Sequence, residues 1–110
     1  PIYGAKIVGT VLNNPELHKM WENELTGMRV RIHEMRHKLV DELNAKSNGQ
    51  DFSFIIHQNG MFSYSGLTPE QVEKLRKDYS VYIVSTGRIC VAALNSHNLD
   101  YVANAIAKVL

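Results

Sequence analysis

Residues 60–71, which read GMFSYSGLTPEQ, decide the fold class because they join a strand to a helix. Phe62 and Tyr64 alternate with serines, as is typical of a short β-strand. Thr68-Pro69-Glu70-Gln71 then forms a capping box with proline at the first helical position, which predicts a helix that continues through Tyr79. A strand followed at once by a helix indicates a mixed architecture.

A long helix is predicted upstream of this stretch. Asn14-Pro15 is a helix-start signal, since asparagine can cap free amide groups and proline lacks only a donor that the first turn does not use. The helix is expected to end near Ser47-Asn48-Gly49, where Asn or Gly can adopt the left-handed conformation. Its apolar stripe consists of Leu17, Trp21, Leu25, Met28, Ile32, Met35, Leu39 and Leu43. Because the rest of the chain is too short to cover this stripe, part of it is expected to contact another domain or subunit.

The other elements follow from local patterns. A first helix is indicated by apolar residues between Ile7 and Leu12, and a last helix, capped by Asn95 or Ser96, carries Leu99, Val102, Ile106 and Leu110. Strands are predicted at Phe52–Ile56, Met61–Ser65, Val81–Val84 and Arg88–Ala92. Together these patterns predict one α+β domain over residues 1–110, a small sheet covered by helices that include one long helix.

Composition is that of an ordinary globular domain. The 110 residues are 45% apolar and 21% charged, and the net charge of +1 is spread without blocks of like charge, so neither nucleic acid nor a membrane is expected as a partner. The single cysteine, Cys90, stands in an apolar run and is interpreted as a reduced, buried thiol of a cytoplasmic protein.

Arg88 is the first candidate binding residue. It stands among small and apolar residues in the segment 85–93, STGRICVAA, at the predicted start of a strand. Its guanidinium is a planar, permanently charged fork that suits a carboxylate, although an arginine beside a strand is more often a surface or ion-paired residue.

A second candidate is the sequence His33-Glu34-Met35-Arg36-His37, which matches the H-E-x-x-H pattern of zinc hydrolases. Arg36 would place a cation beside the metal, and only His57 offers a conjectural third nitrogen ligand. The alternative is that both histidines flank the apolar stripe of the long helix, and no metal-binding residue is assigned.

Residues 51–68, followed by Glu70-Gln71-Val72 and then by Gly87-Arg88, resemble the C-terminal part of the aspartate and aromatic aminotransferases. The similarity runs from Pro1-Ile2-Tyr3-Gly4-Ala5 to the terminal helix, and the spacing from Phe62 to Arg88 fits the family pattern. The resemblance implies the small domain of a fold-type I pyridoxal-phosphate transferase, cut from a longer, homodimeric enzyme that also has a large domain.

The resemblance also implies a function and two site residues. In that family pyridoxal phosphate forms a Schiff base with a lysine and carries the amino group from an L-amino acid to a 2-oxo acid such as 2-oxoglutarate. Arg88 is thereby implied to clamp the substrate α-carboxylate, and Phe62 to line the substrate pocket.

The family's lysine, its cofactor-phosphate ligands and its pyridinium-binding aspartate belong to the large domain. No catalytic or cofactor-binding residue is therefore assigned to this chain, which alone is expected to be inactive and not to bind pyridoxal phosphate. The arginine that recognises a dicarboxylate side chain would also lie upstream of Pro1, so the sequence does not separate aspartate from aromatic substrates. The competing hypothesis is a free-standing, non-catalytic binding or interaction module of the same fold.

Overall fold

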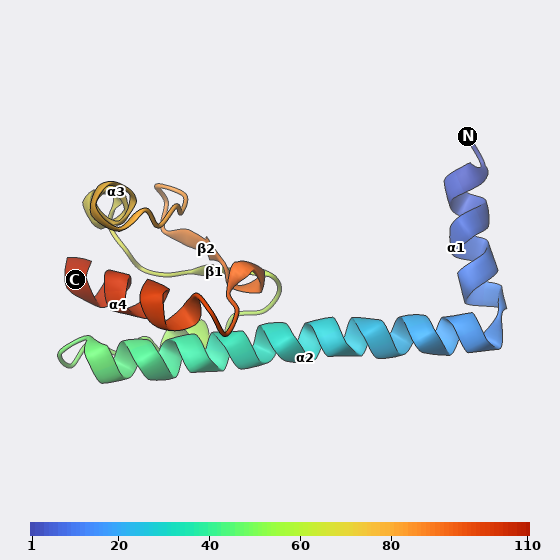
Figure 1. Ribbon diagram of the computed structural model, residues 1–110, viewed down its shortest axis with the longest axis horizontal. Helices are drawn as coiled ribbons and strands as arrows, with labels where there is room; N and C mark the ends of the chain where they lie inside the picture. Colours follow the sequence, from blue (N-terminus) through green and yellow to red (C-terminus); the bar gives the residue numbers. More distant parts are fainter. The chain divides into compact units, whose positions relative to one another are not determined.

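The computed structural model describes all 110 residues, which divide into two compact units, unit one (residues 1–31) and unit two (residues 32–110). The elements in chain order are α1 (Tyr3–Asn13), α2 (Pro15–Lys46), the 3₁₀ turn η1 (Ser53–Ile55), β1 (Phe62–Tyr64), α3 (Pro69–Tyr79), β2 (Arg88–Cys90), the 3₁₀ turn η2 (Val91–Ala93) and α4 (Leu99–Val109) (Figure 1). Helix α2 contributes residues to both units. The predicted class, α+β with a small sheet and one long helix, is confirmed.

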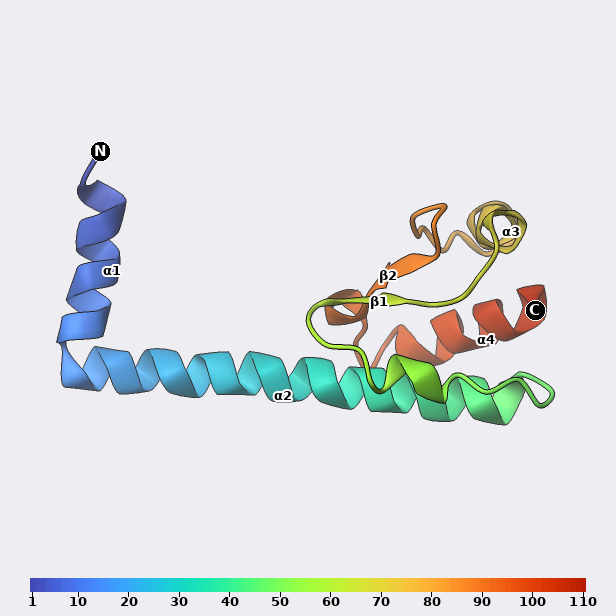
Figure 2. The ribbon, with the colours of Figure 1, turned by 180° about the vertical axis from the view of Figure 1, so that it is seen from behind.

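Unit two holds the hydrophobic core. Helix α4 lies beside the C-terminal part of α2, and both views place η1 against the same helix (Figure 1, Figure 2). The largest fully buried side chains come from α2, η1, α3, η2 and α4, and they include Leu39, Leu43, Ile55, Leu75 and Ile106. Lys46 joins α2 to α4 at the surface by an ion pair of 2.7 Å with Asp100.

The predicted helix boundaries of α2 and α3 are confirmed by their caps. Asn14 Oδ1 accepts hydrogen bonds from the backbone amides of Glu16 and Leu17, and α2 ends before Asn48, whose φ of 50° is left-handed. In α3 the Thr68 hydroxyl accepts from the Gln71 amide while the Gln71 side chain accepts from the Thr68 amide.

Unit one exposes many of its apolar side chains. Helix α1 has no buried residue, and the buried residues of α2 begin only at Met35. The upstream half of the predicted stripe is exposed, as are several apolar residues of α1; the exposed set includes Ile7, Val8, Leu12, Leu17, Trp21, Leu25 and Met28. No helix combines the length and apolar character needed to span a membrane.

Two predicted strands are wrong. Phe52–Ile56 contains the 3₁₀ turn η1, in which Phe52 and Ile55 face the core three residues apart. Asn44 Oδ1 accepts from the Phe52 amide and Asp51 Oδ1 from the Ser53 amide, so local side chains take the donors that a strand partner would need. Val81–Val84 is also not a strand, because this chain provides no segment that pairs with it.

Three smaller expectations are corrected. Strand β2 ends at Cys90, because Val91 begins the turn η2. Helix α4 starts only at Leu99, since Asn95 Oδ1 caps a preceding turn by accepting from the amides of His97 and Asn98. Cys90 is half-buried rather than buried.

Candidate functional site

The two-stranded sheet places Arg88 and Phe62 on one face. Strands β1 and β2 are antiparallel, with Phe62 opposite Cys90, Ser63 opposite Ile89 and Tyr64 opposite Arg88. Because side chains alternate along a strand, Ser63 and Ile89 point into the core and are buried, whereas Phe62, Tyr64 and Arg88 are exposed on the other face. The structure therefore brings together the two residues assigned to substrate binding.

The Arg88 guanidinium lies over the Phe62 ring. Its Cζ atom is 5.1 Å from the ring centroid, within the range of a cation–π contact. Arg88 is exposed and forms no ion pair with a carboxylate of the chain. The fork of N–H donors is thus oriented by an aromatic ring and remains available to an external carboxylate.

Two shallow hollows meet at this pair of residues. One, of about 450 Å³, is lined by Gln58, Asn59, Phe62, Ser63, Tyr64, Thr86 and Arg88. The other, of about 290 Å³, is lined by Phe62, Tyr82, Ile83, Val84, Arg88 and Cys90. Arg88 is the one charged side chain of either hollow, so this surface suits an organic anion with an apolar or aromatic part.

Neither hollow is lined by a lysine. Pyridoxal phosphate, the cofactor implied by the resemblance, needs an amine for its covalent attachment. The residues beside Arg88 therefore do not by themselves fit that cofactor, and what they offer is recognition of a carboxylate.

The backbone before Arg88 is fixed by a close approach at Gly87. The Ser65 hydroxyl donates to the Gly87 carbonyl oxygen at 2.6 Å, and the Ser65 amide donates to the same oxygen at 2.9 Å. Gly87 has a φ of +82°, and a Cβ atom there would lie 2.9 Å from the Leu67 carbonyl oxygen. Only glycine fits this position without strain.

Gly87→Ala is expected to lower the free energy of unfolding by about 1–3 kcal/mol, because it adds both left-handed strain and a backbone clash. Gly49→Ala is the matched control, since Gly49 has a φ of +95° but no atom within 4 Å of the added Cβ. Denaturant titration of both variants measures the difference. An equal loss of unfolding free energy in the two variants would show that the contact between the added Cβ and the Leu67 carbonyl oxygen has no energetic cost.

Arg36 contacts the segment that carries Phe62, a contact that the sequence alone did not predict. It lies on α2 with only 4% of its surface exposed, and it donates from Nε to Ser63 Oγ at 3.3 Å and from Nη2 to the Gly60 carbonyl oxygen at 2.5 Å. The sequence did contain one indication that Arg36 is buried. Arg36 lies one helical turn before Val40 and two turns before Leu43, on the buried face of α2.

The histidine pair of the H-E-x-x-H pattern is close but lacks further ligands. The rings of His33 and His37 are 4.6 Å apart between centroids. The chain contains no group of three or more His, Cys, Asp or Glu side chains that could hold a metal ion, so His57 does not complete a site with them.

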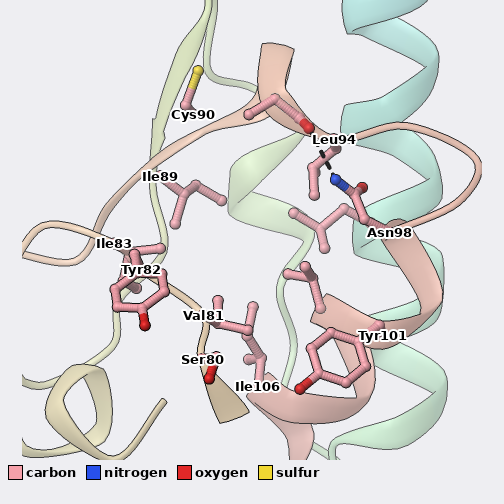
Figure 3. A pocket seen from close by; sticks show the side chains of 13 residues that line it. Ser80, Val81, Tyr82, Ile83, Ile89, Cys90, Leu94, Asn98, Tyr101 and Ile106 are labelled. Carbon is pink, nitrogen blue, oxygen red and sulfur yellow. Dashed lines mark hydrogen bonds between the residues drawn. The ribbon is translucent and has the colours of Figure 1, made fainter. Parts of the chain in front are cut away.

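An apolar pocket of about 330 Å³ also lies in unit two (Figure 3). It is lined by Leu39, Ser80, Val81, Tyr82, Ile83, Ile89, Cys90, Ala93, Leu94, Asn98, Tyr101, Val102 and Ile106. Asn98 is one of its few polar groups, and its side-chain amide already donates to the Ala93 carbonyl oxygen. Without a charged side chain this pocket does not suit a carboxylate, so we take the surface around Arg88 as the candidate site.

The chain belongs to the family described as aminotransferase class I and II, whose model matches residues 1–106. It is 54% identical over 110 residues to an aspartate aminotransferase of Pseudomonas aeruginosa and 43% identical over 110 residues to an aromatic-amino-acid aminotransferase of Escherichia coli. In both comparisons the match covers all of this chain and 28% of the relative.

Solved structures agree with the sequence comparisons. An aromatic-amino-acid aminotransferase from Burkholderia pseudomallei, covalently bound to pyridoxal phosphate, superposes with a TM-score of 0.96 at 59% identity; the match covers all of this chain and 28% of that one. A mitochondrial aspartate aminotransferase from Trypanosoma brucei gives a TM-score of 0.94 at 47% identity, with 99% of this chain and 29% of that one covered. The fold is that of the small domain of a fold-type I transferase, and the chain spans little more than a quarter of the length of these relatives.

Proposed function

We propose that this chain is the substrate-carboxylate-binding domain of a pyridoxal-phosphate-dependent aspartate or aromatic aminotransferase. Such an enzyme transfers an amino group from an L-amino acid to a 2-oxo acid such as 2-oxoglutarate. The observation that carries the proposal is Arg88, unpaired and exposed over the Phe62 ring, in a chain that belongs to the aminotransferase family.

Arg88 is proposed to donate two parallel hydrogen bonds to the α-carboxylate, which both substrates share. Two bonds in one plane fix the direction of the carboxylate as well as its position. The Phe62 ring holds the guanidinium from one side and supplies an apolar wall to the substrate. Together they orient the substrate's amino-bearing or oxo-bearing carbon, which is a positioning contribution to catalysis.

The electron-withdrawing chemistry is supplied by pyridoxal phosphate when it is bound. Because the hollows beside Arg88 contain no lysine, we propose that residues outside this chain hold the cofactor and that the chain alone is inactive. Added pyridoxal phosphate should then give no saturable lysine adduct with the isolated chain.

The exposed apolar residues of unit one support a further part of the proposal. Large apolar side chains are exposed on both α1 and the start of α2, among them Ile7, Trp21 and Leu25. Such exposure is costly in water and typical of a surface that another domain or subunit covers. We propose the large domain and the second subunit of a homodimer as these partners, and a cytoplasmic location for the enzyme.

A chimera tests the proposal against a non-catalytic binding module of the same fold. In it, this chain replaces the matching 28% of the Pseudomonas aeruginosa relative. We expect the chimera to transfer amino groups from aspartate or an aromatic amino acid to 2-oxoglutarate, measured as glutamate formed. A folded chimera that binds pyridoxal phosphate but forms no glutamate would contradict the proposal and favour the binding module.

A further inference from the structure

Arg36 is a buried cation whose partners are neutral. Its side chain donates to the Ser63 hydroxyl and the Gly60 carbonyl, and none of the ion pairs of the chain involves it. Burying an arginine without an acidic partner is unfavourable, and an apolar residue at this position of α2 would serve packing better. Stabilisation of the core therefore does not explain why an arginine occupies this position.

The two acceptors of Arg36 stand on either side of Phe62 in the sequence. Gly60 precedes Phe62 by two residues and Ser63 follows it directly. Ser63 also lies opposite Ile89, the neighbour of Arg88, and lines the larger hollow with Arg88. Arg36 thus fastens to α2 the short segment that presents the Phe62 ring to Arg88.

The other contacts of β1 are made along its edges. On one side β1 pairs with β2, and on the other the Gln58 side chain accepts from the Tyr64 amide at 2.6 Å and donates to the Tyr64 carbonyl oxygen at 3.1 Å. Arg36 adds a side-chain tether from the core side, where Ser63 is buried.

We propose that Arg36 is a positioning residue for substrate binding, an inference that rests on the proposed aminotransferase function. By holding residues 60–63 against α2, it keeps Phe62 in contact with Arg88 and so keeps the guanidinium fork aimed at the substrate carboxylate. Arg36 itself does not touch the substrate.

Steady-state kinetics of the full-length enzyme test this role. In Arg36→Met we expect KM for both the amino acid and the 2-oxo acid to rise about tenfold or more, because a misplaced fork weakens binding of the carboxylate that both share. Ser63→Ala removes one of the two acceptors and should raise both KM values by a smaller factor. In the Arg36→Met background Ser63→Ala should add little, since the bond it removes is already absent.

Leu43→Ala is the control for a merely structural role. Leu43 is buried on the same helix but forms no hydrogen bond to residues 60–64. It should lower the melting temperature and the fraction of folded enzyme, hence the apparent kcat, without changing either KM. Arg36→Lys, which can keep one bond to the strand, should give KM values between those of the wild type and Arg36→Met.

Unchanged KM values in folded Arg36→Met would overturn the inference. It would also be overturned if KM in the double variant rose by the product of the factors found for Arg36→Met and Ser63→Ala alone. If Arg36→Met does not fold, an unchanged KM in Ser63→Ala overturns it alone. The proposed function is tested separately, with the wild-type enzyme. A wild-type enzyme that transfers no amino group refutes the proposed function and the role of Arg36 together. Normal KM values in an active Arg36 variant refute only the role of Arg36.

Discussion

Arg88→Lys in the full-length enzyme is expected to lower kcat/KM by an amount equivalent to about 2–5 kcal/mol, or roughly 30-fold to several thousand-fold. Lysine keeps the positive charge but replaces the planar fork by a single ammonium group. It cannot make two parallel bonds to one carboxylate, and its contact with the Phe62 ring is altered. Steady-state rates with an amino acid and with a 2-oxo acid give the ratio directly.

Arg76→Lys is the matched control for this substitution. Arg76 lies on α3, is exposed, and pairs with Glu73 rather than with a residue of the candidate site. The same change of side chain should leave kcat/KM within about twofold of the wild type, as expected for a surface ion pair. A normal kcat/KM in Arg88→Lys would show that the carboxylate is gripped elsewhere.

Leu39→Ala is expected to lower the free energy of unfolding by about 2–5 kcal/mol. Leu39 is fully buried on α2 in the core of unit two, so truncation removes buried apolar surface and leaves a cavity. Denaturant titration of the 110-residue chain, followed by circular dichroism, measures the change.

Leu25→Ala is the control on the same helix, since Leu25 is 48% exposed in unit one. In the isolated chain it should change the free energy of unfolding by no more than about 0.5 kcal/mol. A loss from Leu25→Ala as large as that from Leu39→Ala would mean that the stripe of α2 is buried along its whole length within this chain.

The helices were predictable because their signals are local. Asn14 and Thr68 cap α2 and α3 through side chains that the sequence displays, and Asn48 and Gly49 mark the end of α2 by their left-handed conformations. The exposure of the upstream stripe could also be anticipated, because a chain of this length has too little surface to cover it.

The two wrong strands show where local pattern is insufficient. Phe52–Ile56 has strand-like residue types, but Asn44, eight residues before Phe52, takes the Phe52 amide and favours a turn. Val81–Val84 keeps an alternating exposure pattern, with Val81 buried and Tyr82 exposed, yet a strand also needs a partner, which no local sequence specifies.

The candidate site was predictable only in part. Arg88 and Phe62 were assigned through the family resemblance, and the register of β1 and β2 brings them together. The role proposed for Arg36 rests on contacts across 24 and 27 residues of sequence, which spacing along one helix does not reveal. From the sequence alone, Arg36 was interpreted only as a positive charge that disfavours a zinc site.

The most direct test of the central claim is a crystal structure of the full-length enzyme with bound 2-oxoglutarate. We predict two Arg88 nitrogen atoms at about 2.7–2.9 Å from the two oxygens of the α-carboxylate, with the guanidinium still over the Phe62 ring. A bound 2-oxo acid whose α-carboxylate is held by other residues, with Arg88 directed to solvent, would contradict the account.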